Sequence, residues 1–178
     1  MRLLRSLVLT LIALPCALAA PQNSQTSTVP VLPSVTAYGL DRAKVTLPGD
    51  FAAPLNLLIL HFQRDQQSVV DGWLPVLAPG GTVQTWVLPI SARENALYRW
   101  WFNSSLRSSL PPSQQRRYTV PLYVDKAKFL RSLQVSSEQE VVLLLTDKAG
   151  HVLWRTTGAV TDSKKAALTS FVSRSATR

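Results

Sequence analysis

Two nearly continuous apolar runs dominate the hydrophobic pattern of this chain. Residues 55–62 (LNLLILHF) and 141–145 (VVLLL) contain few polar positions, which is typical of strands that are covered on both faces. Residues 82–90, between these runs, carry the side chains that favour a third strand. Two shorter segments, 35–38 and 44–47, have the composition of weaker strands. The pattern therefore predicts a sheet with buried central strands.

Apolar residues at helical spacing predict helices between these strands. Asp65 is placed to cap a helix that begins at Gln66 and is kinked near its end by Pro75. Ser91 is placed to cap a second helix, which carries Leu97 and two tryptophans. The other expected elements are a polar connection over 104–117, an extended segment over 118–124, a helix over 126–133 capped by Asp125, a turn over 147–150, a strand over 151–155 and a helix over 162–172.

The order of these elements indicates the fold class. Strands and helices alternate in the first half of the chain, which implies parallel strands joined by right-handed crossovers. The turn at 147–150 closes an antiparallel hairpin, so the sheet should be mixed. We therefore predict an α/β fold of three layers, in which a mixed central sheet has helices on both faces.

The first twenty residues have the features of a secretory signal peptide. Arg2 and Arg5 precede an apolar run at 7–14, and residues 17–19 (ALA) have the small–x–small pattern of a cleavage site. Cleavage near Ala19 would leave an extracytoplasmic protein, periplasmic or secreted, whereas an uncleaved segment would act as an anchor. The expected regions are a signal peptide at 1–19, a flexible leader rich in Pro, Ser and Thr at 20–34, a folded domain at 35–173 and a tail at 174–178.

Charge and cysteine content narrow the possible functions. The 178 residues include 19 Lys and Arg against 10 Asp and Glu, for a formal net charge of +9. Cys16 is the only cysteine, so cleavage near Ala19 would leave a mature chain without a thiol. Thiol–disulfide exchange and thiol peroxidase chemistry both require a thiolate, and the mature chain is excluded from both. With two histidines and no mature cysteine, we expect neither a metal site nor a cofactor.

Three segments of the chain have patterns found in a known superfamily. They are VPLYVDKAKFLRSLQV, the hairpin VVLLLTDKAGHVLWRTTG, and RWWFNSSLRSSLP. With the predicted order of elements, the first two resemble the thioredoxin-like fold superfamily, in its extracytoplasmic thiol-reductase and peroxiredoxin branch. The third, taken with LYVDKAKF, is similar to bacterial relatives of mitochondrial ATP synthase assembly factors. The resemblance covers about residues 35–172 and implies a thioredoxin-like fold.

The same resemblance shows which residues this chain lacks. Redox members carry a Cys-x-x-Cys motif, or a single reactive cysteine, just after the first core strand, and a cis-proline before the hairpin strand. The matching segments here are 63–68 (QRDQQS) and 137–140 (SEQE). Since neither contains a cysteine or a proline, the resemblance implies a thioredoxin-like protein without the redox site.

His61 and Asp65 are the candidate catalytic residues. His61 lies near the C-terminal end of a predicted core strand, where open α/β sheets bind ligands. Asp65 could orient it as a general base for Ser68, which would make the protein a hydrolase-like enzyme. The simpler interpretation is a half-buried histidine bonded to the backbone, because no nucleophile elbow is present.

Most of the mature positive charge lies between residues 93 and 131. Eight basic residues face two acidic ones there, which could attract an acidic protein or an anionic membrane surface. The basic residues could equally form a solvated surface, with both tryptophans packed in the core. No nucleic-acid-binding motif is present, so no nucleic-acid partner is expected. The candidate partner-binding residues are Arg99, Trp100, Trp101, Arg107, Arg116, Arg117, Lys126 and Lys128.

These observations favour a non-redox, extracytoplasmic binding or accessory protein, such as an assembly or chaperone-like factor. The hydrolase-like enzyme that uses His61 and Asp65 is the alternative. A third possibility is a decayed redox enzyme with no dedicated binding surface.

Overall fold

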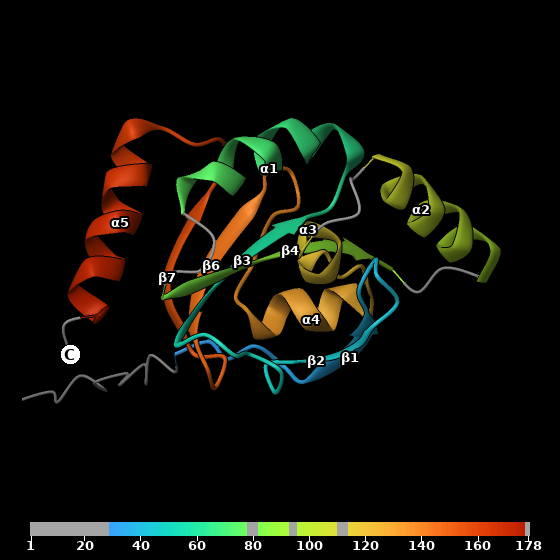
Figure 1. The fold of residues 1–178 in the computed structure, drawn as a ribbon, viewed down its shortest axis with the longest axis horizontal. Coiled ribbons are helices and arrows are strands. Elements are labelled where there is room, and N and C mark those ends of the chain that lie inside the picture. Colours follow the sequence, from blue (N-terminus) through green and yellow to red (C-terminus); the bar gives the residue numbers. More distant parts are fainter. Residues whose placement is uncertain (1–28, 78–81, 93–95, 110–113, 177–178) are drawn as a thin grey trace, which may run out of the picture.

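The computed structural model describes residues 29–77, 82–92, 96–109 and 114–176 (Figure 1). The predicted signal peptide at 1–19, most of the predicted leader and the last two residues lie outside this part of the chain. Among the described residues, no helix is both long and apolar enough to cross a membrane.

A mixed five-stranded sheet forms the centre of the fold, in the order β5-β4-β3-β6-β7. β3 pairs in parallel with β4 and in the antiparallel direction with β6, which confirms the predicted mixed sheet. All seven residues of β3 are buried, as its apolar sequence predicts. The strands are β3 (Leu55–His61), β4 (Val83–Ser91), β5 (Leu122–Tyr123), β6 (Val142–Asp147) and β7 (Val152–Thr157).

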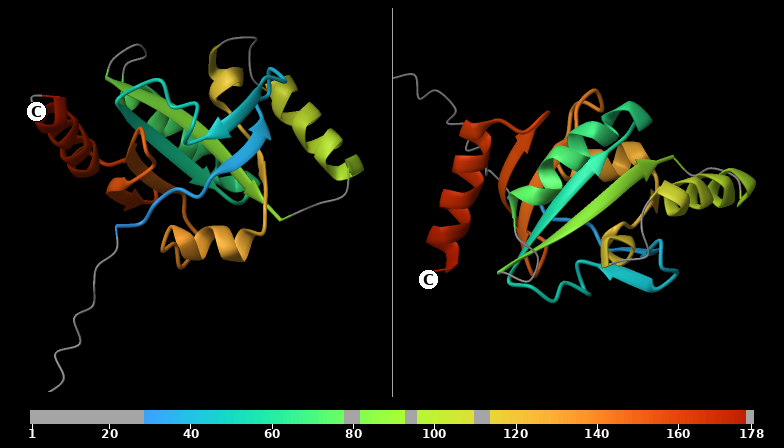
Figure 2. Two further views of the ribbon diagram at one scale, coloured as in Figure 1. Left: turned by 90° about the horizontal axis from the view of Figure 1, so that it is seen from below. Right: turned by 45° about the horizontal axis from the view of Figure 1, so that its top comes forward.

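Helices cover both faces of this sheet, as predicted (Figures 1 and 2). Leu57 and Ile59 of β3 pack with α1 and α5, whereas Leu58 and Leu60 pack on the opposite face with α4 and β2. Alternate residues of one strand thus fill two separate cores. The elements outside the central sheet are β1 (Val35–Tyr38), β2 (Lys44–Leu47), η1 (Arg64–Gln66), α1 (Gln67–Trp73), η2 (Leu74–Val76), α2 (Ala96–Ser109), α3 (Gln114–Tyr118), α4 (Lys126–Ser132) and α5 (Asp162–Ala176).

The packed part of the chain begins before Val35 and continues beyond the predicted end of the last helix. The backbone N–H of Leu32 donates to the carbonyl of Gly150 over 2.8 Å, and the Leu32 side chain is only 2% exposed. Residues 29–34 were expected to belong to a flexible leader, but this segment pairs with the β6–β7 hairpin. At the other end, α5 runs to Ala176 through positions that the sequence placed in a tail.

The start of the first helix differs from the prediction. Gln63, and not Asp65, is the N-terminal cap, and its side chain and that of Gln66 form a reciprocal capping box. Asp65 lies inside the short η1 helix and is exposed. Gln66 accepts hydrogen bonds from the backbone N–H groups of Phe62 and Gln63, which fixes the turn two residues before the predicted cap.

The region after β4 differs most from the secondary structure that the sequence predicted. Ser91 is not a helix cap, because it is the last residue of β4 and pairs with Tyr123. The connection predicted over 104–117 is largely helical, since α2 extends to Ser109 and α3 follows. The extended segment predicted over 118–124 is confirmed from Thr119 onward as an irregular edge strand, since Thr119 bridges to Val87 and β5 pairs with the end of β4. Tyr118 instead packs edge-on against the Trp86 ring, with centroids 5.0 Å apart.

Two local predictions in the second half of the chain are confirmed. Asp125 caps α4, because its side chain accepts a hydrogen bond from the Lys128 backbone N–H over 3.1 Å. The β6–β7 turn ends at Gly150, whose φ of +87° is unfavourable for residues with a Cβ atom. Both features depend on neighbouring residues only, which is why sequence reasoning could find them.

Candidate functional site

A cavity of about 210 Å³ lies at the C-terminal ends of the parallel strands β3 and β4. Open α/β sheets bind ligands at this end of their strands. The first turn of α1 and the middle of α2 supply further walls. We call it the strand-end cavity; its lining residues are His61, Phe62, Gln63, Arg64, Gln67, Pro89, Ile90, Ser91, Ser105 and Leu106.

His61 is the most deeply buried polar residue of the strand-end cavity. Its residue is 5% exposed, and its Nε2 atom has no hydrogen-bond partner. Burial lowers the pKa of His61, because the protonated ring loses its hydration, and this outweighs the opposing effects of the Gln63 backbone and the Asp71 charge. The ring is therefore neutral at pH 7, and one polar atom is left without a partner.

The residues predicted to act with His61 do not contact it. Asp65 and Ser68 are both exposed, on η1 and on the first turn of α1. No hydrogen bond in the described part of the chain joins either side chain to His61, so the arrangement of a general base and its nucleophile is not formed. Within the same residues, no cluster of three or more His, Cys, Asp or Glu side chains is placed to hold a metal ion.

Gln66 links the two segments, 63–68 and 137–140, that the sequence resemblance matched with a redox site. Its Oε1 atom accepts hydrogen bonds from the backbone N–H groups of Phe62 and Gln63, at 2.8 and 3.3 Å. Its Nε2 atom donates to the carbonyl of Glu138 over 2.9 Å. A carboxamide at this position joins the segments 63–68 and 137–140 through hydrogen bonds and has no disulfide chemistry. The Gln-x-x-Gln spacing of residues 63–66 is a sequence signal for the capping box alone, and the sequence analysis did not use it.

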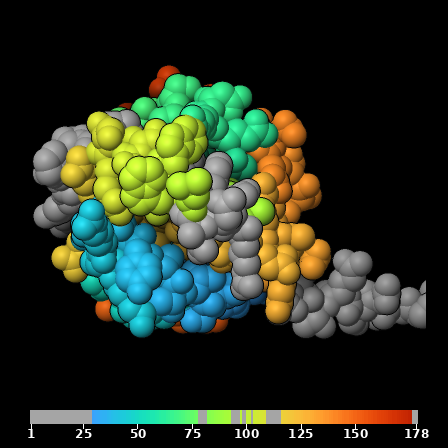
Figure 3. All heavy atoms as spheres, turned by 90° about the vertical axis from the view of Figure 1, so that its right-hand side faces the viewer, coloured from blue at the N-terminus to red at the C-terminus, as the bar shows by residue number. Residues whose placement is uncertain are grey.

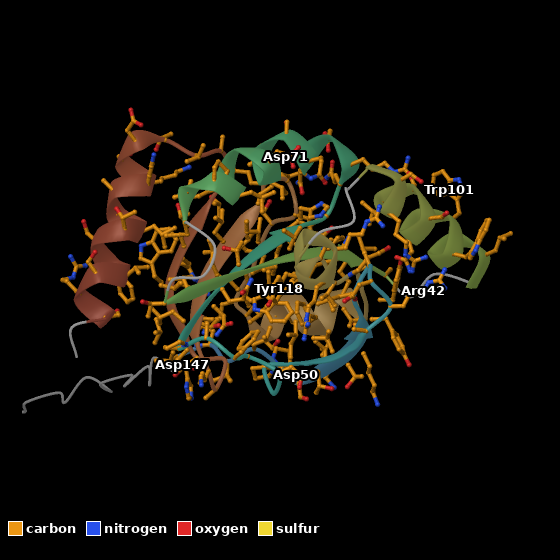
Figure 4. All side chains as sticks on the ribbon, in the orientation of Figure 1. Arg42, Asp50, Asp71, Trp101, Tyr118 and Asp147 are labelled. Atoms are coloured by element: carbon orange, nitrogen blue, oxygen red, sulfur yellow. The ribbon has the colours of Figure 1, made fainter. Side chains whose placement is uncertain are left out.

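Three large apolar side chains are exposed together on α2. Leu97, Trp100 and Trp101 are 73%, 67% and 48% exposed, and their spacing of i, i+3 and i+4 places them on one side of the helix. We call these three residues the α2 face; Figure 3 views this end of the molecule and Figure 4 labels Trp101. The interpretation that both tryptophans pack in the core is therefore wrong.

A cation–π contact joins the α2 face to the strand-end cavity. The guanidinium carbon of Arg64, a cavity residue, lies 4.4 Å from the centroid of the Trp101 ring. Such contacts stabilise an exposed pair by about 0.5–1 kcal/mol. The α2 face and the cavity are therefore neighbouring parts of one surface, which we treat as the candidate functional site.

The predicted basic residues serve different purposes. Arg107 donates through Nε to the carbonyl of Leu40 over 2.9 Å, and Arg116 donates to the carbonyl of Arg107 over 2.7 Å. These bonds hold α2 and α3 against the β1–β2 loop, so both arginines have a structural role. Among the others, Lys126 forms an ion pair with Glu138, Arg117 and Lys128 are exposed, and the Arg99 side chain lies outside the described part of the structure.

Comparison with known proteins identifies the fold. No model of a known protein family matches this sequence, and neither does any curated protein. Among solved structures, a thiol:disulfide interchange protein from Bacteroides sp. is 17% identical with a TM-score of 0.55, and the match covers 83% of this chain and 91% of that protein.

Two further solved structures match the fold of this chain. An exposed lipoprotein thioredoxin from Streptococcus pneumoniae is 12% identical with a TM-score of 0.53, covering 77% of this chain and 97% of that one. BsSco, a member of the Sco family of cytochrome c oxidase assembly proteins, is 14% identical with a TM-score of 0.54, covering 79% and 92%. The chain therefore has the thioredoxin-like fold, as its sequence pattern predicted.

The unpartnered Nε2 atom of His61 leads to a prediction about stability. His61→Leu is expected to raise the free energy of unfolding by about 1–3 kcal/mol at pH 7, because a buried polar atom without a partner costs about that much. Between the folded-state pKa and about 6.5, the unfolded chain binds a proton at His61 that the folded chain does not bind. The free energy of unfolding of the wild type therefore decreases as the pH falls from about 6.5 toward the folded-state pKa of His61. The leucine variant has no titrating group at this position, so it does not show this decrease.

Urea unfolding at pH 7.5 and pH 5 measures both effects. His151→Gln is the control for loss of a histidine at an exposed position beside the β6–β7 turn, where Nδ1 lies 2.8 Å from Asp147 Oδ2 and the ring is not left buried without a partner. The difference between His61→Leu and the wild type should be larger at pH 5 than at pH 7.5. A leucine variant that is less stable than the wild type at both pH values would contradict the placement of His61.

Proposed function

We propose that the protein is an accessory protein that acts outside the cytoplasm by binding another protein, and that it performs no thiol chemistry. The observation that carries this proposal is the α2 face, where Leu97, Trp100 and Trp101 are exposed side by side. Tryptophan and arginine are enriched among the residues that dominate binding energies. Arg64, which contacts Trp101, supplies the charged member of such a set.

The residues at the former redox positions support a binding function. The chain has no cysteine after position 16, and Gln66 occupies the region where redox relatives place a thiol. Its three hydrogen bonds keep the segment after β3 in one conformation. A thioredoxin-like fold whose central segment is held in this way provides a rigid support for a binding surface.

Location outside the cytoplasm and a role in assembly are supported by analogy. The pattern of residues 1–19 is that of a signal peptide. One similar structure is described as an exposed lipoprotein, and another belongs to a family of cytochrome c oxidase assembly proteins. These likenesses are consistent with an accessory factor of a membrane complex.

An acidic protein is the partner that the charges favour. Residues 96–118 contain four arginines and no Asp or Glu, so this surface should attract negative charge. Binding to an anionic membrane strengthens by about 1 kcal/mol for each basic residue near the surface. Arg107 and Arg116 hydrogen bond to backbone carbonyls of this chain, so both attract any anionic partner less. A membrane, whose attraction grows with the number of basic residues, loses more by this than a protein that also packs on the α2 face. The hydrolase-like alternative has no comparable support, because neither Asp65 nor Ser68 contacts His61.

Photo-crosslinking in the cells of origin tests the proposal. A photoreactive amino acid replaces Leu97 in one strain and Leu153 in another. Leu153 is the control because it is also exposed, at 41%, but lies on β7 at the opposite edge of the sheet (Figure 1). We expect position 97 alone to crosslink a defined protein whose purified form binds this one with an affinity that falls as salt is raised.

Two results would contradict the proposal. Equal crosslinking from both positions would show that the α2 face has no special role. Crosslinks from position 97 to lipid alone would replace the protein partner by a membrane surface.

A further inference from the structure

A second cavity, of about 380 Å³, lies between β2, the first half of β4 and the end of α3. Its volume falls within the range of about 300–1,000 Å³ that is usual for small-molecule sites. None of the described residues that line it belongs to α2 or to the strand-end cavity. We call it the β2–α3 cavity; Figure 4 labels two of its lining residues, Asp50 and Tyr118.

Aromatic side chains form one wall of the β2–α3 cavity. Trp86 and Tyr118 both line it, and their rings meet edge-on with centroids 5.0 Å apart. On its other side the Trp86 ring packs against Phe51, with centroids 5.6 Å apart. The indole Nε1 atom donates to Oδ1 of Asn56 over 3.0 Å, so its polar atom already has a partner within the protein. The two rings are therefore fixed in place and offer an apolar surface to an aromatic ligand.

Two basic side chains from distant parts of the sequence line the same cavity. Lys44 comes from β2 and Arg117 from α3, and both are exposed. The two elements lie together because the backbone N–H of Leu40 donates to the carbonyl of Arg116 over 3.0 Å, which joins the β1–β2 loop to α3. Neither the Lys44 nor the Arg117 side chain forms a hydrogen bond or an ion pair with another described residue. Both charges are therefore accessible to a ligand.

The charges around the β2–α3 cavity favour an anion. Among the described residues that line it, Asp50 is the only acidic one. Its Oδ2 atom accepts a hydrogen bond from the backbone N–H of Thr46 over 2.7 Å, which holds this carboxylate against the turn after β2. Two basic side chains against one carboxylate leave a net positive charge, which attracts negative ligands. Arginine and lysine are both common binders of phosphate, whose two negative charges match two cations.

We propose that the β2–α3 cavity binds a small aromatic phosphate. Lys44 and Arg117 hold the phosphate oxygens, and the ring of the ligand packs on Tyr118 and Trp86. This site goes beyond the proposed function and uses none of the residues of the α2 face. Trp100→Ala combined with Trp101→Ala should therefore leave the affinity for the phosphate ligand unchanged, so the two proposals fail separately.

Isothermal titration calorimetry at pH 7.5 with three probes tests the site. Phenyl phosphate has both the ring and the charge, inorganic phosphate lacks the ring, and phenol lacks the charge. We expect phenyl phosphate to bind the purified protein about three- to tenfold more tightly than inorganic phosphate, which is the effect of one aromatic contact. Phenol should bind at least about tenfold more weakly than phenyl phosphate, because it makes no charged contact.

Two double variants and one spectroscopic signal locate the contacts. Lys44→Gln combined with Arg117→Gln should weaken phenyl phosphate by about tenfold or more. Arg42→Gln combined with Lys128→Gln is the matched control, because it removes the same charge from two exposed side chains that do not line the cavity. Its affinity should match the wild type. In two-dimensional NMR spectra, phenyl phosphate should shift the indole N–H signal of Trp86.

Three results would overturn the proposal. The first is that phenyl phosphate does not bind, and the second is that inorganic phosphate binds as tightly. The third is an equal loss of affinity in the two double variants, which would show attraction to the general positive charge of the protein and no site at the β2–α3 cavity.

Discussion

Trp100→Ala combined with Trp101→Ala is expected to weaken binding of the crosslinked partner at least about 100-fold while leaving the fold intact. Tryptophans at the centre of an interface each contribute about 2 kcal/mol or more, although such contributions are not additive. A loss of about 2.7 kcal/mol corresponds to a factor of 100. Both side chains are about half exposed or more, so their removal takes little from the core. The measurement is the Kd of the purified pair by calorimetry, with thermal unfolding of each variant.

Leu153→Ala is the matched control for this double variant, since it also truncates an exposed apolar side chain. It should bind the partner as the wild type does. Partner binding within threefold of the wild type in the tryptophan double variant would show that the α2 face is not the docking surface. A large drop in the unfolding temperature would instead show that the two rings support the fold.

Trp73→Ala is expected to produce the largest loss of stability, about 3–5 kcal/mol. Trp73 is fully buried at the end of α1, where it packs against the central sheet. Its Nε1 atom also donates a hydrogen bond to the carbonyl of Gly158 over 3.0 Å. Small domains are stable by only about 5–15 kcal/mol in total, so this variant should unfold at much lower urea concentrations.

Trp73→Phe separates packing from hydrogen bonding at the same position. It keeps an aromatic ring in the core but leaves the Gly158 carbonyl without its donor, so we expect an intermediate loss of about 1–2 kcal/mol. Urea unfolding curves of the two variants provide the comparison. If Trp73→Ala cost less than about 1 kcal/mol, α1 would not be packed on the sheet through this residue.

The contrast between Trp73 and the tryptophans of α2 explains how this fold combines stability with binding. The buried ring connects α1 to the segment after β7 and stabilises the layers. The exposed rings contribute little to the layers, and they are the rings that we propose a partner covers. Gln66 also stabilises the layers, because its hydrogen bonds join the segment after β3 to the carbonyl of Glu138.

The sequence alone could predict the central strands and the hairpin because the signals are local. The runs at 55–62 and 141–145 have no continuous polar face to expose, and their short length favours interior strands over buried helices. The cap at Asp125 and the positive φ at Gly150 depend on residues within one turn. The absence of a thiol from the segment after the first core strand is likewise a property of the sequence itself.

The candidate site was predicted only in part, because its contacts join distant segments. Proximity in sequence suggested that Asp65 would orient His61, but the η1 turn directs Asp65 to solvent. The actual contact of this turn, from Gln66 to Glu138, spans 72 residues. The position of Arg64 over Trp101 likewise depends on how α2 returns to the end of β3.

The sequence by itself determined the thioredoxin-like order of strands and helices and the absence of cysteine from residues 63–68, because apolar runs, caps and residue identities act locally. Only the tertiary structure decided which aromatic residues are buried and which remain exposed. A tryptophan has the same preference for burial at position 73 as at positions 100 and 101. The outcome depends on whether the sheet lies beneath the helix, and for α2 it leaves Leu97, Trp100 and Trp101 exposed.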